Sequence, residues 1–526
     1  MLRLLGCALL ALSTLSARAG EVADGPIVSF EIVRFEVQGN TLLPQPSIEA
    51  VLAPFTGAKR EFSDVERAIE ALRAAYHRRG FKLVQVVLPE QELTDGVVHL
   101  QVVEAHIGKV MVEGNRVFDQ TNIRRSLPGL REGEVPDLDR ISASLKLANE
   151  SPAKKTTLQL QNSDAPDAID ATVRVTDEKA WKVGLTVDNT GNSATGETRV
   201  GLVYQHANVL GLDHVASLVY TTSPDQPNNV SIYGAGYHIP LYRSGDSIDL
   251  YAAHSNVDAG TVSAGGFGLQ VSGKGSASGI RYNQNLGSAR GIESKLAYGL
   301  DYRAYEDDAA LSGVPIGSDV TVHPVSLTYL AKWTPAAAEM VAYMGAAANV
   351  PGGKNGSDAD FERVRTGASA DYTLLRYGAS YRQGLPREWQ MYLNLSGQYT
   401  RDLLIPGEQF AVGGATTVRG FQEREIAGDV GYFYNAELLT PDLCSGIKRA
   451  ETHCRALVFV DGARLWRNQP LPGEDSGASI GSVGVGMRMS IDRNVSVRID
   501  MAQVIDAGGT EAKGDRRIHF SVGFYY

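Results

Sequence analysis

The sequence contains no spacing of metal ligands or paired cysteines that is typical of a catalytic centre. His-Glu-x-x-His and Cys-x-x-Cys, the patterns of zinc peptidases and thiol redox sites, are both missing. The 10 histidines are scattered, and His214, His238 and His254 occur in stretches that alternate like strands. We therefore predict no catalytic residue, no metal site and no cofactor, and we interpret the protein as a non-enzyme.

The polar side chain in the most unusual setting is Arg419. It lies in the tetrad Val418-Arg419-Gly420-Phe421, inside a long glycine-rich stretch around 407–431. A guanidinium group offers five hydrogen-bond donors and keeps its charge at any physiological pH. Wherever the fold removes this arginine from bulk water, we expect it to meet an anionic partner.

Length and composition restrict the kinds of protein that could hold such a stretch. The 526 residues include 56 glycines and carry a formal net charge of −10, without a Lys/Arg-rich block, which argues against a nucleic-acid binder. The apolar run Leu4–Leu12 precedes the small-residue sequence at 17–19, which predicts a secretory signal peptide at 1–19 and a short N-terminal segment at 20–28. No later stretch reaches the roughly 18 apolar residues of a spanning helix, so any membrane contact must be made by strands.

Two segments repeat the same short pattern, FEVQGN at 35–40 and VMVEGN at 110–115. Such an internal repeat suggests two copies of one small domain. Each copy continues with two helical segments and two strand-like segments, so we predict the order β-α-α-β-β in both. This organisation places two soluble α+β domains at 29–105 and 106–179.

The first copy shows the local signals most clearly. We expect a strand within Phe30–Val37, and a helix with Ser63 and Glu66 as its capping box. Two further strands, Phe81–Leu88 and Val97–Val103, are expected to be joined through the Asp-Gly turn that precedes the second.

From Trp181 onward, strict alternation of apolar and polar residues replaces helical periodicity. In the segment 495–502, for example, Val, Val, Ile and Met alternate with Ser, Arg, Asp and Ala. A soluble β-sandwich shows the same alternation, but here it follows a signal peptide and continues to the aromatic end at Tyr526. At about 20 residues per strand and connection, the fold class is mainly β, with an antiparallel transmembrane β-barrel of about 16 strands at 180–526 and a polar lumen.

Several segments together resemble one family, the two-partner secretion transporters of the hemolysin secretion/activation family. The stretch 407–431 resembles the sixth loop of these outer-membrane pores, which folds inward, and its tetrad resembles the signature of the wider superfamily. Other segments resemble their two periplasmic POTRA domains and the opening strands of their barrel. These segments are Phe81, Pro89, Gln91 and Gly96; Leu145–Pro152; Asp188–Gly191, Thr195, Gly196 and Arg199; and Asn208–Asp213.

The resemblance also suggests the partner of Arg419. In the family, a barrel-wall aspartate in a Phe-x-Asp-x-Gly motif holds the loop arginine, and here Asp461 matches it in Phe459-Val460-Asp461-Gly462. The glycine directly follows the aspartate, which departs from the family pattern. Alternation places Asp461 on the face opposite to Val460. The alternative is a solvated arginine in the lumen and an aspartate in a turn.

Cys444 and Cys454 lie between two expected strands, in a connection that the topology places on the periplasmic side. An oxidising compartment favours their pairing. We expect a disulfide that stiffens the turn; the alternative is two free thiols.

The resemblance implies an outer-membrane translocase that exports an unfolded large partner protein, of adhesin or hemolysin type, from the periplasm to the cell surface. Its expected partners are this secreted passenger protein, with an N-terminal secretion domain, and outer-membrane lipid; the pore is expected to be monomeric and to bind no nucleic acid. The first alternative is an outer-membrane protein insertase of the same superfamily. A passive porin is the second, but a porin needs neither the periplasmic repeats nor the tetrad of Arg419.

Overall fold

The computed structural model describes residues 29–526, with gaps at 194, 258–259, 265–266, 272–273, 307–309, 312–313, 316–317, 447–450 and 471. The expected signal peptide at 1–19 and the segment 20–28 lie outside the described residues. Contacts divide the chain into two compact units, Met1–His106 and Ile107–Tyr526. None of the described helices is both long and apolar enough to cross a membrane.

The first unit is a small α+β domain. Its elements are β1 (Phe30–Ile32), β2 (Arg34–Gln38), α1 (Gln45–Leu52), η1 (Ala53–Phe55), β3 (Gly57–Arg60), α2 (Phe62–Arg78), β4 (Gln85–Val87) and β5 (Val97–Val103). The sheet order is β2-β5-β4, with β2 parallel and β4 antiparallel to the central strand. Apolar side chains of α2 and β5, among them Leu72, Tyr76 and Leu100, are fully buried and form its core.

The predicted order of elements is confirmed in this unit, with β1 and β3 as an additional two-stranded sheet. β5 coincides with the predicted strand, but only Gln85–Val87 of the segment expected at 81–88 forms a strand. The predicted capping box is wrong. α2 begins at Phe62, and Glu61 and Asp64 form the box, because Glu61 has the extended backbone, with φ −113° and ψ 165°, that an N-cap requires.

The second unit begins with another α+β domain of the same order. Its elements are β6 (His106–Glu113), α3 (Gln120–Ser126), α4 (Leu138–Ala148), β7 (Lys154–Asn162) and β8 (Ala168–Asp177), and the sheet order is β6-β8-β7. Its buried core contains Phe118, Ile123 and Ile141, and it continues into Ala207 and Val215 of the barrel. This domain and the barrel therefore share one hydrophobic cluster.

The two repeats close their first turn in the same way. The side-chain amides of Asn40 and Asn115 each donate a hydrogen bond to the carbonyl group three residues later. A carboxylate at the end of the last strand, Glu104 in the first copy and Asp177 in the second, accepts backbone N–H groups of the residues that follow this asparagine. The sequence repeat therefore corresponds to a shared set of hydrogen bonds.

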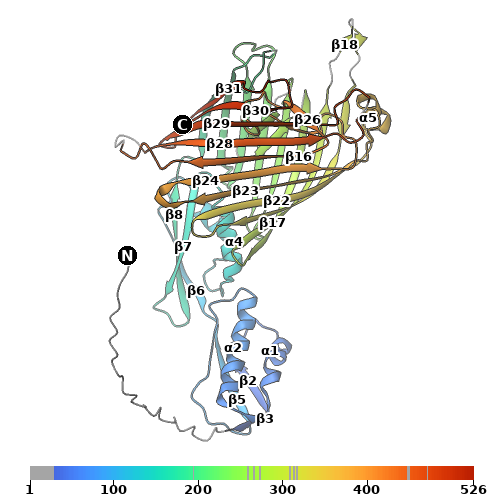
Figure 1. Ribbon diagram of the computed structural model, residues 1–526. Coiled ribbons are helices and arrows are strands. Elements are labelled where there is room, and N and C mark those ends of the chain that lie inside the picture. Colours follow the sequence, from blue (N-terminus) through green and yellow to red (C-terminus); the bar gives the residue numbers. More distant parts are fainter. Residues whose placement is uncertain are drawn as a thin grey trace, which may run out of the picture. The chain divides into compact units, whose positions relative to one another are not determined.

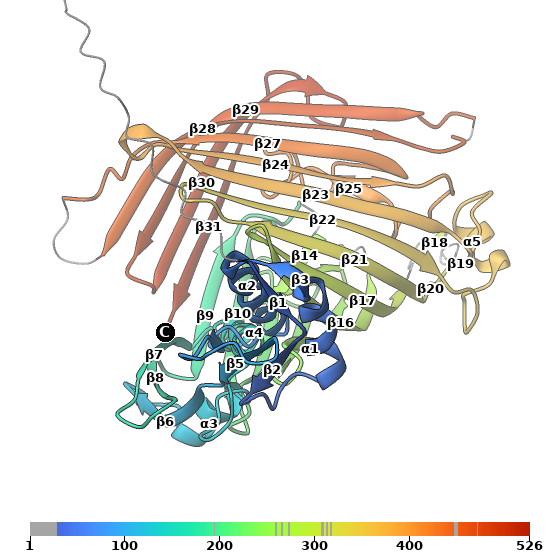
Figure 2. The same cartoon turned by 90° about the horizontal axis from the view of Figure 1, so that it is seen from below.

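The rest of the second unit is a closed antiparallel barrel, shown from the side in Figure 1 and from below in Figure 2. The strands β20 and β21 pair with the same neighbour and form one wall strand, and β31 pairs with β9, so the wall has 16 strands. The predicted barrel is confirmed. The wall strands are β9 (Trp181–Asp188), β10 (Arg199–Val209), β11 (His214–Thr222), β12 (Ile232–Leu241), β13 (Asp246–Ser255), β16 (Gly275–Ala289), β17 (Ile292–Tyr305), β20 (Val320–Val322), β21 (Pro324–Trp333), β22 (Ala338–Asn349), β23 (Thr373–Gly384), β24 (Gln390–Tyr399), β27 (Val430–Leu439), β28 (Thr452–Trp466), β29 (Gly477–Ile491), β30 (Val495–Ala507) and β31 (Arg516–Tyr525).

Alternation along each strand separates an apolar outer face from a polar inner face. On β30, Ile499 and Met501 are 38% and 46% exposed, whereas Asp500 between them is 1% exposed. This is the pattern predicted for a wall between lipid and a polar lumen.

The connections lie at two ends of the wall. The chain enters β9 from the second α+β domain, so the turns after β10, β12, β16, β21, β23, β27 and β29 lie at that end. The longer connections at the opposite end carry α5 (Asp358–Val364), β14 (Gly260–Ala264), β15 (Phe267–Val271), β18 (Ala310–Leu311) and β19 (Val314–Pro315), and Figure 1 shows α5 there, away from α4. The remaining elements are η2 (Pro386–Glu388), in the turn after β23, and β25 (Phe410–Val412) and β26 (Ile426–Gly428), which pair between β24 and β27.

Candidate functional site

The connection between β24 and β27 folds back on itself as the hairpin of β25 and β26; we call residues 400–429 the inner loop. Its turn requires glycine at Gly414, whose φ is +103° and where a Cβ atom would collide with the carboxyl group of Glu423. Glu423 in turn accepts a hydrogen bond from the backbone N–H of Ala415, at 2.8 Å. The glycine-rich sequence therefore allows a tight fold that carries Arg419 at its tip.

Arg419 is fixed to the wall by a bidentate ion pair. Its Nε and Nη2 atoms donate to the two carboxylate oxygens of Asp461 on β28, at 2.7 and 2.8 Å, and its backbone N–H donates to the same carboxylate at 3.1 Å. The guanidinium carbon lies 3.4 Å from the ring centroid of Phe459. Arg419 is 3% exposed and Asp461 is 1% exposed, so the structure brings the two predicted residues together in a site removed from water.

Two further carboxylates complete the site, and sequence reasoning missed both. The Nη1 atom of Arg419 donates to Glu437 on β27 at 2.7 Å and lies 3.4 Å from Asp500 on β30. Arg488 on β29 donates to Asp500 at 2.8 Å. We call Arg419, Asp461, Glu437, Asp500 and Arg488 the lumen cluster. Alternation assigns Asp500 to the polar face, but only the pairing of neighbouring strands shows that these acids converge.

The rest of the tetrad packs against the wall. The backbone N–H of Gly420 donates to Nε2 of His519 on β31, at 2.9 Å. Gly420 has a φ of +96°, and a Cβ atom there would lie 3.2 Å from the Cβ of Ala502. Phe421 is fully buried in a hydrophobic cluster that includes Phe433 and Val418. The packing and hydrogen bonds at each of the four positions therefore explain which residue type the tetrad has there.

The base of the inner loop is held by a second set of charges. The carboxylate of Glu408, which is fully buried, accepts hydrogen bonds from Arg303 at 2.7 and 3.0 Å and from the hydroxyl of Tyr305 at 2.6 Å. Gln398 on β24 donates to the backbone carbonyls of Glu408 and Asp429, one on each limb of the loop. The sequence analysis did not single out these residues, and no motif marks them.

The end of the inner loop is clamped by the neighbouring outer connections. Asp429 is 0% exposed, and its carboxylate accepts hydrogen bonds from both terminal nitrogens of Arg365, which follows α5. It also accepts the backbone N–H groups of Leu404 and Asn468, at 3.1 and 2.8 Å. The inner loop is thus anchored at its tip, its base and its end.

The Asn208–Asp213 segment forms the joint with the second α+β domain. Nζ of Lys154 on β7 pairs with the carboxylate of Asp213 and donates to Oδ1 of Asn122, at 3.0 Å, while the hydroxyl of Tyr242 donates to Asp213 at 2.8 Å. Burial lowers the pKa of Lys154, although the Asp213 carboxylate opposes this shift. Burial and the same carboxylate raise the pKa of Tyr242. The segment therefore positions the domain against the barrel.

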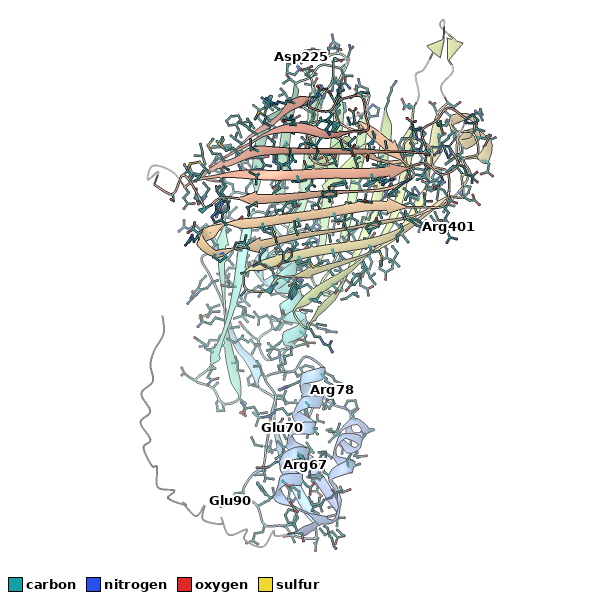
Figure 3. All side chains as sticks on the ribbon, in the orientation of Figure 1. Arg67, Glu70, Arg78, Glu90, Asp225 and Arg401 are labelled. Atoms are coloured by element: carbon teal, nitrogen blue, oxygen red, sulfur yellow. A yellow bond between two sulfur atoms is a disulfide. The ribbon has the colours of Figure 1, made fainter. Side chains whose placement is uncertain are left out.

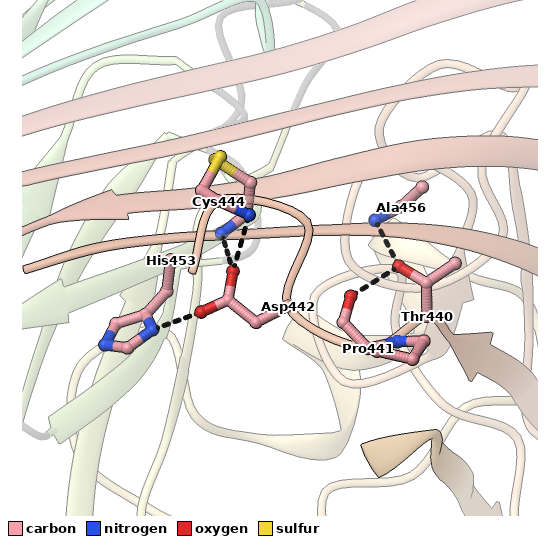
Figure 4. Close-up of a disulfide and its surroundings, with 7 residues drawn as sticks. Thr440, Pro441, Asp442, Cys444, His453 and Ala456 are labelled. Atoms are coloured by element: carbon pink, nitrogen blue, oxygen red, sulfur yellow. Dashed lines mark hydrogen bonds and ion pairs between the residues drawn. A yellow bond between two sulfur atoms is a disulfide. The ribbon is translucent and has the colours of Figure 1, made fainter. Parts of the chain in front are cut away.

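A disulfide joins Cys444, in the turn after β27, to Cys454, the third residue of β28, as shown in Figure 4. The carboxylate of Asp442 accepts the backbone N–H groups of both cysteines, at 3.0 and 2.9 Å, and pairs with the ring of His453 at 2.6 Å. These contacts, with the N–H of Cys454 foremost, lower the pKa of Asp442 to about 2. The turn lies at the same end of the barrel as α4, far along the strands from the loop's outer clamp.

A closed 16-stranded barrel with a charged loop held inside it, after two α+β repeats, defines a polypeptide-transporting outer-membrane barrel. The haemolysin secretion/activation protein ShlB/FhaC/HecB family matches residues 168–489, and the ShlB-type POTRA domain matches residues 30–105. The chain belongs to the haemolysin secretion/activation protein family.

Curated relatives and solved structures agree with this assignment. The outer membrane transporter CdiB of Escherichia coli O6:K15:H31 (strain 536 / UPEC) is 24% identical over 433 residues, covering 79% of this chain and 69% of CdiB. The structure of CdiB from Escherichia coli is similar with a TM-score of 0.74 at 20% identity, covering 98% of this chain and 93% of that one. BamA from Haemophilus ducreyi lacking POTRA domains 1–3 gives a TM-score of 0.50 at 15% identity, covering 94% of this chain and 100% of that one.

The protein is therefore an outer-membrane transporter of the two-partner secretion type, with its POTRA domains in the periplasm. This function is favoured over that of an insertase. The turns on the side of α4 are periplasmic, and the connections that carry α5 face the cell surface.

Proposed function

We propose that the protein exports one large partner protein, of adhesin or hemolysin type and in an extended state, from the periplasm to the cell surface, and that the inner loop gates this path. The observation that carries the proposal is the buried contact of Arg419 with Asp461, Glu437 and Asp500, three acids on three wall strands. Removing one partner of a buried ion pair leaves an uncompensated charge. The loop is therefore a positioned obstacle in the lumen, which moves only when its charges find other partners.

The periplasmic domains offer a means of capturing the passenger. In the second domain, β6 and β7 are the edges of the sheet β6-β8-β7, and β7 is paired only with β8 among the described strands. An extended segment adds to such an edge through main-chain hydrogen bonds, while pockets for alternate side chains give selectivity. The passenger's N-terminal secretion domain is the segment that we expect to bind there. Folding of the passenger outside the cell would then favour outward movement.

The role of the loop is tested by Arg419→Ala, with Arg498→Ala as the matched control. Like Arg419, Arg498 is an arginine of the lumen, but it lies on the wall strand β30, two residues from Asp500. No hydrogen bond joins it to the described part of the inner loop. Each variant is co-expressed with an epitope-tagged copy of the proposed partner, which is to be sought as a large secreted protein encoded beside the transporter gene. We expect Arg419→Ala to reduce the tag at the cell surface by about tenfold, since a buried charged contact is lost, and Arg498→Ala to leave it unchanged.

Heat-modifiable migration of the barrel in electrophoresis controls for insertion of each variant. Equal secretion by the two variants at equal barrel levels would remove the loop from the mechanism. A transporter-deletion strain that loses other folded outer-membrane barrels, but keeps export of the tagged protein, would instead indicate an insertase.

A further inference from the structure

The lipid-facing wall is hollowed over β22. A cavity of about 990 Å³ opens on the outer face between β16 and β24. Ala346 and Ala348 point outward at its centre, and Tyr298, Leu300 and Tyr399 stand around it. We call this hollow the outer trough.

Strand pairing explains why the outer face of the wall is hollow at this place. Ala346 pairs with Leu327 on β21 and with Leu375 on β23, so a methyl group lies between two long side chains on the same face. Ala348 pairs in the same way with Val325 and Thr373. Two small residues in succession on the outer face of one strand therefore form a channel between two apolar ridges.

The position of the outer trough along the strands places it in the outer leaflet. Ala348 is the next-to-last residue of β22, Thr373 is the first of β23, and Tyr399 is the last of β24. These strand ends lead into the connections that face the cell surface. The trough therefore contacts acyl chains of the outer leaflet.

A cation lies at the surface end of the outer trough. Arg401 lies two residues after the end of β24, lines the trough and is exposed at the rim of the wall, where Figure 3 labels it. Its Nε atom is 3.5 Å from the hydroxyl of Tyr399, and its terminal nitrogens donate no hydrogen bond to any residue the structure describes. The carboxylate of the adjacent Asp402 is occupied by the N–H and hydroxyl groups of Thr373. The guanidinium group is thus available to an anion at headgroup level.

We propose that the outer trough binds a phosphorylated glycolipid of the outer leaflet, with an acyl chain over Ala346 and Ala348 and a phosphate group on Arg401. The planar guanidinium group matches the geometry of phosphate oxygens. An acyl chain fills the channel without polar groups to desolvate. The shape of the trough and the charge at its end therefore select the same kind of molecule.

The bound lipid would support the wall where the inner loop is anchored. Leu375 and Tyr399 face the trough, and an adjacent residue on each strand, after Leu375 and before Tyr399, faces the lumen. These lumenal neighbours are Arg376, which lies 3.5 Å from the carboxylate of Glu408, and Gln398, which donates to both limbs of the inner loop. A lipid at this place packs against the outer side of the loop's anchor.

The proposal is tested by native mass spectrometry of the full-length protein in detergent, with added lipopolysaccharide lipid A or phosphatidylglycerol as probes. Arg401→Glu reverses the charge and Ala348→Leu fills the trough. We expect each to reduce the fraction of protein with bound lipid A by about tenfold, because charge-assisted contacts and shape fit each contribute to binding. Phosphatidylglycerol is expected to bind the wild type and both variants equally weakly.

Two substitutions serve as controls. Arg387→Glu makes the same charge change at the periplasmic end of the strand pair β23 and β24. Ala252→Leu fills a second outward hollow of about 680 Å³, whose described lining includes no lysine or arginine. Lipid A binding should stay within about twofold of the wild type in both. Equal lipid A binding by all variants, or equal binding of the two lipids, would overturn the proposal, and heat-modifiable migration verifies that each barrel is folded.

Discussion

Lys154 and Asp213 join the second POTRA domain to the first periplasmic turn of the barrel, and their side chains are 0% and 2% exposed. An ion pair this deeply buried is costly to form, because both charges lose their water. Its value is in geometry: Lys154 also donates to Asn122 of its own domain, and Tyr242 of the barrel also donates to Asp213, so the cation and the carboxylate meet only when the domain is docked. The domain nearest the pore is therefore fixed at one angle to the barrel.

Lys154→Met should loosen this joint, because Asp213 would be left buried without a cation, at a cost of about 3–5 kcal/mol. Trypsin cleavage after Arg125, on the helix that contacts the turn, provides the measurement. We expect faster cleavage in this variant. Lys155→Met is the control, since Lys155 is exposed and binds only the carbonyl of Asn149 among the residues described. Equal cleavage of both variants would show that the pair does not hold the domain.

Asp461→Asn should release the tip of the inner loop more than Glu437→Gln does. Asp461 accepts three hydrogen bonds from Arg419, including one from its backbone, whereas Glu437 accepts one. Thr416→Cys supplies a reporter thiol near the tip. Its labelling by a maleimide should accelerate by about tenfold or more with Asp461→Asn and by less with Glu437→Gln. The reverse order would mean that Glu437 is the principal anchor.

Arg365→Met should open the outer clamp of the inner loop. Asp429 would lose its bidentate partner in a buried site, a change that costs about 3–5 kcal/mol. Protease added to intact cells should then cut the loop near residues 401–407. Arg363→Met removes a nearby arginine that pairs within α5 only with Asp360 among the described carboxylates, and it should leave the loop resistant. A resistant Arg365→Met barrel would contradict the clamp.

Asp177 should make the second POTRA repeat sensitive to acid. Burial raises its pKa, but the backbone N–H groups of Phe118, Val117 and Arg116 together lower it by more, so its pKa lies below the usual range. Its stabilising effect is therefore full above the unfolded pKa of about 3.9, and it is lost as the pH falls through the lower folded value.

The prediction is measured by hydrogen-exchange protection of the amides at 116–118. Asp177→Asn should lower protection at pH 7, and this difference from the wild type should shrink below about pH 4. Asp164→Asn, in an exposed turn of the same domain, is the control. A difference that is the same at both pH values would exclude the carboxylate as its source.

The disulfide between Cys444 and Cys454 should be dispensable for export. It closes a periplasmic turn in which Asp442 already binds both cysteine N–H groups. The double variant Cys444→Ser/Cys454→Ser should secrete within about twofold of the wild type, because a bridge across so short a loop stabilises only locally. Maleimide-polyethylene glycol should shift wild-type migration only after reduction. A secretion defect in the double variant would give the bridge a role in transport.

Sequence reasoning reached the barrel because alternation is a property of each strand by itself. It reached Asp461 through the resemblance of Phe459-Val460-Asp461-Gly462 to the family motif, and alternation placed this residue on the face opposite to Val460. Sequence reasoning could not identify Glu437 and Asp500 as partners of Arg419, because their approach to Arg419 depends on the pairing of four strands around the loop. Arg365 and Asp429 were missed for the same reason: 64 residues separate them, and no local pattern marks either.

The lumen cluster also has a consequence for the order in which the protein assembles. Its acids come from β27, β28 and β30, and the histidine that binds Gly420 comes from β31, the last strand of the chain. The binding place for Arg419 is thus incomplete until the final hairpin has formed. A loop left outside after closure would have to enter past the clamp of Arg365 and Asp429. The loop therefore reaches its full set of contacts only after β31, the last strand of the chain, has joined the wall.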